Sequence, residues 1–108
     1  ALVALDRLDE AGAALETARS AEPANAESWL LSATLARRQG DLAQAQTQIE
    51  QAAQLAPRDP QIGLEAGVIA ALAGREADAR KSFQSVLDVA PQSEQAAQAK
   101  AYLEQLNP

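Results

Sequence analysis

The fold of this chain is decided by two consecutive stretches: residues 26–59 read AESWLLSATLARRQGDLAQAQTQIEQAAQLAPRD, and residues 60–93 read PQIGLEAGVIAALAGREADARKSFQSVLDVAPQS. The same landmarks recur at one constant interval in the two stretches, as Leu30/Leu64, Ala36/Ala70, Gly40/Gly74, Ala43/Ala77, Ala45/Ala79 and Pro57/Pro91. A fixed period of this length is typical of stacked supersecondary units. Such a stack offers an extended surface rather than a catalytic pocket.

Each stretch carries the start and stop signals of two helices. Asn25 is a good N-cap for the first helix, and Gly40 ends it. Asp41 begins the second helix, which stops before Pro57. The cycle repeats after the Asp59-Pro60 pair, and Ser93 caps a last helix. These signals predict helices over residues 26–39, 41–56, 60–73, 76–89 and 93–106.

The N-terminal part is expected to be a partial unit. Pro23 precedes Pro57 by the same interval that separates Pro57 from Pro91, and this period places Asp6 at the glycine turn. Residues 8–21 are therefore predicted to form the second helix of an earlier unit, and residues 1–5 the tail of its first helix. Asp can adopt the left-handed conformation that glycine supplies elsewhere, at some cost.

These landmarks resemble the tetratricopeptide repeat (TPR) motif, in which W-x2-L-G-x2-Y, A-x3-F and P follow one another within a single repeat. The matching positions are Trp29, Ala45, Ile49 and Pro57 in the first unit, and Gly67, Ala79, Phe83 and Pro91 in the second. The chain departs from the motif where Ser32-Ala33 replaces Leu-Gly, Gly63 replaces Trp, and Ala36 and Ala70 replace the two tyrosines.

The resemblance implies an all-α fold: antiparallel helix-turn-helix repeats stacked as a short right-handed α-solenoid with a C-terminal capping helix. We expect a single domain over residues 1–107. Its parts are a partial repeat (1–25), two full repeats (26–59 and 60–93) and the capping helix (94–107). Each helix pair has apolar faces on both sides, so only stacking buries them.

The resemblance also implies that the first helix of each pair lines a concave groove where a peptide lies. The groove residues expected on this basis are Leu30, Thr34, Arg37, Arg38, Leu64, Val68 and Ala71, with Glu27, Gln61, Leu72, Gln98 and Tyr102 beside them. Arg37 and Arg38 would form a basic corner that meets an acidic group. Alternatively, they are solvated arginines at a helix C-terminus, where the helix dipole favours them.

Other prominent residues have packing interpretations. We expect Trp29 and Phe83 to fill the core rather than to bind a ligand. The Gly63-Leu64-Glu65-Ala66-Gly67 stretch indicates close approach of neighbouring helices, and Gly63 would make room for Trp29. Carboxylates outside the caps are expected on solvated faces, for example in a Glu76–Arg80 pair.

Composition excludes several function classes. The net charge is −6, which argues against nucleic-acid binding and against docking on an anionic membrane. The chain has no Cys and no His, so thiol chemistry and the commonest general base and metal ligand are missing. We expect no catalytic residues, no metal site, no cofactor and no membrane insertion, in a soluble protein of the cytoplasm or periplasm.

The sequence therefore predicts a non-catalytic module that binds a peptide segment of another protein. The alternative is a structural segment of a longer array or multidomain protein that packs in cis or self-associates. Because residues 8–21 should expose apolar surface, a homodimer through the N-terminal half-repeat is a further expectation.

Overall fold

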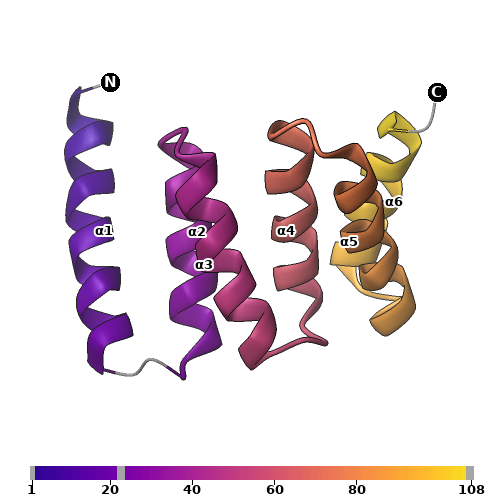
Figure 1. Cartoon of the computed structure of the whole chain (residues 1–108), viewed down its shortest axis with the longest axis horizontal. Coiled ribbons are helices and arrows are strands. Elements are labelled where there is room, and N and C mark those ends of the chain that lie inside the picture. The colour runs from indigo at the N-terminus through magenta and orange to yellow at the C-terminus, as the bar shows by residue number, and fades with distance from the viewer. Residues whose placement is uncertain (1, 22–23, 107–108) are drawn as a thin grey trace.

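The computed structural model describes residues 2–21 and 24–106, with side chains from Glu10 onward, and consists of six α-helices without strands in these ranges (Figure 1). The helices are α1 (Leu2–Ala21), α2 (Ala26–Arg38), α3 (Leu42–Leu55), α4 (Pro60–Leu72), α5 (Glu76–Val89) and α6 (Glu94–Leu106). The all-α prediction is confirmed. The ends of α2 to α6 lie within one residue of the predicted bounds.

The predicted N-caps hold the helix starts. Asn25 Oδ1 accepts a hydrogen bond from the amide of Glu27 at 3.0 Å, and Asp59 Oδ1 accepts one from the amide of Gln61 at 2.9 Å. Asp41 caps α3 and Ser93 caps α6 in the same way, at 3.1 Å and 3.0 Å. Each cap satisfies an amide that the helix itself leaves without a partner.

Glycine makes both turns inside the helix pairs. Gly40 has φ 83° and Gly74 has φ 80°, the left-handed region that residues with a Cβ rarely adopt. The turns are closed by backbone hydrogen bonds, such as those from the amide of Asp41 to the carbonyl of Ala36 and from Arg75 to Ala70, both 2.9 Å. Each glycine therefore ends one helix and reverses the chain into the next, as the sequence predicts.

The predicted turn at Asp6 is wrong, because α1 is one continuous helix through that position. No residue other than glycine has positive φ in the described part of the chain. The left-handed conformation costs a residue with a Cβ about 1–2 kcal/mol. A continuous helix avoids that cost and keeps its backbone hydrogen bonds through residue 6. Residues 2–5 therefore belong to α1 and are not the tail of another helix.

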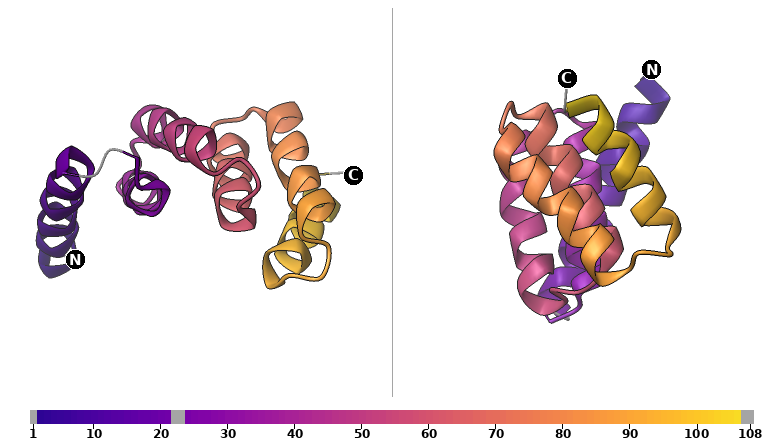
Figure 2. Two further views of the ribbon diagram at one scale, coloured as in Figure 1. Left: turned by 90° about the horizontal axis from the view of Figure 1, so that it is seen from below. Right: turned by 90° about the vertical axis from the view of Figure 1, so that its right-hand side faces the viewer.

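The helices stack into a curved array (Figure 2). Seen from below, α2 and α4 lie on the inner side of the arc, and α3 and α5 on its outer side. One apolar cluster joins α2, α3 and α4 around Ile49, Ile62 and Ile69. A second cluster joins α4, α5 and α6 around Phe83 and Val86. Both clusters are rich in alanine, which lets the helices approach closely.

Helices α4 and α5 approach each other closely at two glycines of α4. A Cβ at Gly67 would overlap the ring of Phe83, which is fully buried, and a Cβ at Gly63 would lie 2.8 Å from Val86 Cγ2. The close-approach interpretation of these glycines is confirmed. The expected role of Gly63 as space for Trp29 is wrong, because the space it leaves is filled from α5.

Trp29 packs against the first apolar cluster, as predicted, although its side chain is only half-buried. It also helps to hold α1, because the guanidinium of Arg19 lies 5.2 Å from the centre of the Trp29 ring. Arg19 Nη1 donates a hydrogen bond to the hydroxyl of Ser32 on α2 as well. Of the described helices, α1 contacts only α2.

We predict that Gly67→Ala lowers the free energy of unfolding by roughly 1–3 kcal/mol, because the added methyl overlaps the Phe83 ring. Gly12→Ala in α1 is the matched control. Its nearest neighbour would be Leu35 Cδ2 at 3.4 Å, an ordinary contact. Alanine there should raise stability by about 0.5–1 kcal/mol through helix propensity. Urea denaturation followed by circular dichroism measures both effects, and a neutral or stabilising Gly67→Ala would contradict the packing described.

Candidate functional site

The inner face of the arc contains a hollow between α2, α4 and α6, which we call the central groove. Its volume is about 430 Å³. The residues that line it are Leu30, Leu31, Thr34, Arg37, Gln61, Leu64, Glu65, Val68, Gln95, Gln98 and Tyr102. Four of these side chains are aliphatic and six are polar or charged, so the lining combines apolar and polar surface.

The structure brings together five of the seven residues predicted for the site: Leu30, Thr34, Arg37, Leu64 and Val68. Gln61, Gln98 and Tyr102, expected beside them, also line the groove. Ala71 instead packs against the second apolar cluster. Arg38 turns toward α1 and lines a different hollow. Neither Glu27 nor Leu72 is part of the groove lining.

Three groove residues were not predicted: Leu31, Glu65 and Gln95. Leu31 is 48% exposed. The sequence does contain a feature that singles out Glu65: it is the one charged residue of α4. A carboxylate within an otherwise apolar helix needs a partner when it is buried. The sequence does not say which partner, since that depends on how α2 and α4 face each other.

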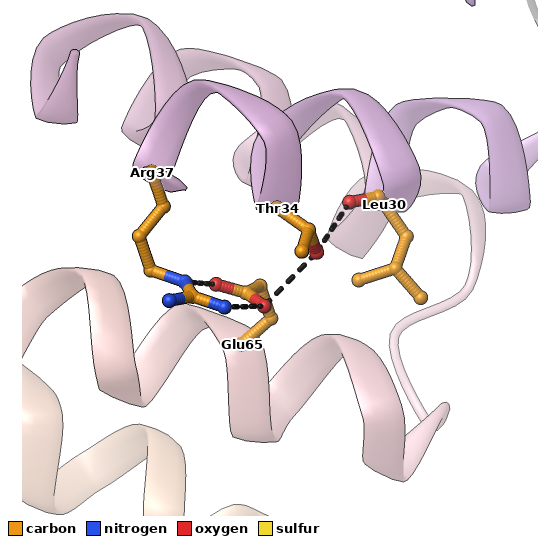
Figure 3. A network of polar contacts seen from close by, with 4 residues as sticks. All are labelled: Leu30, Thr34, Arg37 and Glu65. Atoms are coloured by element: carbon orange, nitrogen blue, oxygen red, sulfur yellow. Dashed lines mark hydrogen bonds and ion pairs between the residues drawn. The ribbon is translucent and has the colours of Figure 1, made fainter. Parts of the chain in front are cut away.

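That partner is Arg37, which reaches from α2 to α4 (Figure 3). Arg37 Nε lies 2.5 Å from Glu65 Oε2, and Arg37 Nη2 lies 3.3 Å from Glu65 Oε1. The hydroxyl of Thr34 donates to Glu65 Oε1 at 2.9 Å and is also within 3.1 Å of the carbonyl oxygen of Leu30. Both carboxylate oxygens are therefore engaged, in the two-point geometry that arginine favours.

This network changes the electrostatics expected of the groove. The predicted basic corner at Arg37 and Arg38 is wrong for Arg37, because Glu65 neutralises it. Glu65 is also not on a solvated face, since its side chain is only 11% exposed. The two residues are the only charged members of the groove lining that the structure describes, and they cancel. The central groove is thus electrically neutral in an acidic protein.

Tyr102 forms the α6 wall of the groove and connects it to the core. Its ring stacks on the buried Phe83 ring with centroids 5.0 Å apart and an interplanar angle of 8°. Tyr102 is nevertheless 36% exposed, so one part of the side chain faces the groove. Stacking of this kind fixes the ring position.

A second hollow adjoins the central groove between α1 and α2, and we call it the α1–α2 crevice. Its volume is about 460 Å³. It is lined by Ala11, Ala14, Leu15, Leu31, Thr34, Leu35 and Arg38. Leu31 and Thr34 belong to both hollows, so the two lie side by side.

Neither hollow contains an arrangement of residues with evident catalytic chemistry. Among the side chains that the structure describes, in residues 10–21 and 24–106, no three acidic groups come close enough together to bind a metal ion. Within the same ranges, no helix has the length and apolar character that crossing a membrane demands.

The chain belongs to the tetratricopeptide repeat family. The sequence profile of that family, described as tetratricopeptide repeat, matches residues 1–44 and again residues 30–94. The two matches overlap and together extend over most of the chain. A comparison with curated protein sequences finds no match.

Solved structures of TPR domains have the same fold. The first TPR of Spaghetti (RPAP3), bound to the HSP90 peptide SRMEEVD, is 19% identical with a TM-score of 0.86, over 96% of this chain and 80% of that one. The Arabidopsis OM64 TPR domain is 20% identical with a TM-score of 0.85, over 94% and 82%. PcrH in complex with the chaperone-binding region of PopD is 19% identical with a TM-score of 0.86, over 96% and 81%. At these identities the similarity establishes the fold.

We predict that Glu65→Gln lowers the free energy of unfolding by about 1–2 kcal/mol, because Arg37 loses a charged acceptor where its side chain is only 25% exposed. Glu76→Gln is the matched control. Glu76 pairs with Arg80 at 4.0 Å on the surface, with side chains 65% and 44% exposed. That substitution should change stability by less than about 0.5 kcal/mol. Equal losses in parallel denaturation curves would contradict a special role for the Arg37–Glu65 pair.

Proposed function

We propose that this protein is a non-catalytic interaction module that holds a peptide segment of another protein in the central groove. The observation that carries the proposal is the exposure of large apolar side chains there. Four such side chains are exposed in the described chain, and two of them, Leu31 and Tyr102, line this groove. Exposed apolar surface gathered in a hollow is typical of an interaction site.

The fold neighbours support a peptide as the ligand. The RPAP3 domain is bound to a peptide of HSP90, and PcrH is bound to the chaperone-binding region of PopD. In the central groove of this chain, α4 supplies apolar anchors, Leu64 and Val68, and α4 and α6 supply the amide groups of Gln61 and Gln98. The apolar anchors would hold side chains of the peptide, and the amides would bond its backbone.

Because the groove carries no net charge, it favours some partner segments over others according to their charge. Some TPR domains grip the carboxylate end of a partner with Lys and Asn, at the places where this chain has Leu30, Thr34, Leu64 and Val68. Arg37, the one cation in the groove lining, is already bound to Glu65. We therefore propose that the central groove holds an uncharged, largely apolar stretch of the partner, and not an acidic tail.

Val68→Arg should reduce partner capture by at least about tenfold, because a charge would replace an apolar anchor in the middle of the groove. Val68 is half-buried, so the long arginine stem can lie along the groove with its charge in water. Helicity and the unfolding midpoint should therefore remain close to those of the unaltered protein. The measurement is affinity capture from lysate on the immobilised chain, quantified by mass spectrometry.

Gln51→Arg is the control for added charge. Gln51 lies on the exposed side of α3, away from the buried residues of that helix. The Gln51→Arg substitution should therefore leave partner capture unchanged. Equal capture by all three proteins would reject the groove as the binding site, and a collapse of helicity in Val68→Arg would assign Val68 a structural role instead.

A second proposal is self-association through the N-terminal half-repeat. It is favoured by the position of α1, which contacts only α2 among the described helices, and by the exposure of Ala13 on it. Small residues allow two helices to approach closely. The exposed side chains of residues 10–21 are otherwise small or polar, and alanine is the only apolar residue type among them.

If α1 joins two copies, sedimentation velocity should give a dimer that grows with protein concentration. Ala13→Lys should then restore the monomer, because it places a charge in the contact without touching α2. A monomer at every concentration would reject this second proposal and leave the groove function unaffected.

A further inference from the structure

The α1–α2 crevice is a second hollow on the inner face, outside the central groove. Its walls are almost entirely apolar: Leu15 and Leu35 are half-buried, and Leu31 stands 48% exposed between the two hollows. The polar members of the lining are Thr34, whose hydroxyl already bonds Glu65, and Arg38. Such a hollow is complementary to a bulky aliphatic side chain.

The charge of Arg38 distinguishes this crevice from the central groove. Arg38 is exposed, and its side chain has no ion pair or hydrogen bond with any residue that the structure describes. Its neighbour Arg37 is held by Glu65. The helix dipole accounts for a cation in the last turn of α2. The crevice lining contains no acidic residue, so Arg38 is available there to an acidic group of a ligand.

The two hollows can be occupied by one ligand. Leu31 and Thr34 line both, so the two hollows are next to each other. The array is 38 Å long, and its inner face runs from α1 to α6 along that axis (Figures 1 and 2). An extended peptide advances about 3.3–3.6 Å per residue, so a segment of about a dozen residues can lie across both.

We infer that the α1–α2 crevice is a second subsite for the same partner peptide. It takes one bulky aliphatic side chain, Leu, Ile or Val, while Arg38 pairs with a carboxylate next to that residue in the partner sequence. The inference rests on the proposed function, which places the rest of the peptide in the central groove. It adds a recognition element that the neutral central groove lacks: an acidic residue adjacent to an aliphatic anchor.

The test is selection of phage-displayed random dodecapeptides on the immobilised full chain, with Arg38→Gln and Arg58→Gln in parallel. Arg58 is an exposed arginine after α3, outside both hollows, and serves as the matched control. We expect unaltered protein and Arg58→Gln to enrich peptides with an acidic residue adjacent to a bulky aliphatic one. Arg38→Gln should keep the aliphatic preference and lose the acidic one.

The outcomes separate this inference from the proposed function. Enriched peptides that lack the acidic–aliphatic pair would overturn the inference while leaving the groove function intact. Loss of the acidic preference in Arg58→Gln as well would also overturn it, since the effect would then be one of net charge. Enrichment of no peptide by the unaltered, folded protein would overturn both.

Affinities of one selected peptide complete the test. Replacing its acidic residue by the matching amide should weaken binding to the unaltered protein about threefold, and should have no effect on Arg38→Gln, because the pair is solvent-exposed. Ala14→Gln, at an exposed position on the crevice wall, should weaken binding of the same peptide by partly filling the hollow. Unchanged affinity in Ala14→Gln would overturn the aliphatic half of the inference.

Discussion

The contact between the Phe83 ring and the bare backbone of Gly67 is the constraint on which the inner face depends. It fixes the distance between α4 and α5, because no side chain at position 67 would fit beside the ring. The ring of Tyr102 on α6 stacks on the same Phe83 ring, with the centroids of the two rings 5.0 Å apart. Three helices are therefore positioned around one buried side chain. Because α4 and α6 both pack on Phe83, this contact positions the two walls of the central groove that these helices form.

The remaining wall, α2, is positioned across the groove by a polar contact. Arg37 and Thr34 both bind Glu65, so the pairing that neutralises the groove also fixes α2 against α4. Because the pair is mostly shielded from water, breaking it would leave a charge with poor solvation. The groove can thus be neutral without being built only from apolar residues.

The single cation left without a partner in the two described hollows lies where α1 meets α2. There the packing is looser, because α1 contacts only α2 in the described structure and is held by Arg19 over Trp29 and by the Arg19–Ser32 hydrogen bond. An apolar crevice remains open beside this junction. The inner face therefore has two chemically different parts, a neutral one framed by rigid packing and an apolar, cationic one at its N-terminal end.

The sequence by itself determined the elements and their order. Helix ends followed from local chemistry: Asn25, Asp41, Asp59 and Ser93 cap their own helices, and Gly40 and Gly74 adopt a conformation open to glycine. These interactions join residues close in the chain, so a pattern suffices to predict them. The one local failure, at Asp6, came from extending a repeat to a residue whose Cβ disfavours that turn.

Tertiary structure alone decided that Glu65 holds Arg37, that Gly63 faces Val86 and not Trp29, and that Arg38 faces α1. Each of these depends on the rotation of one helix about its axis relative to another. That rotation is set by the packing of all side chains together, and it cannot be predicted from the spacing of residues along the sequence.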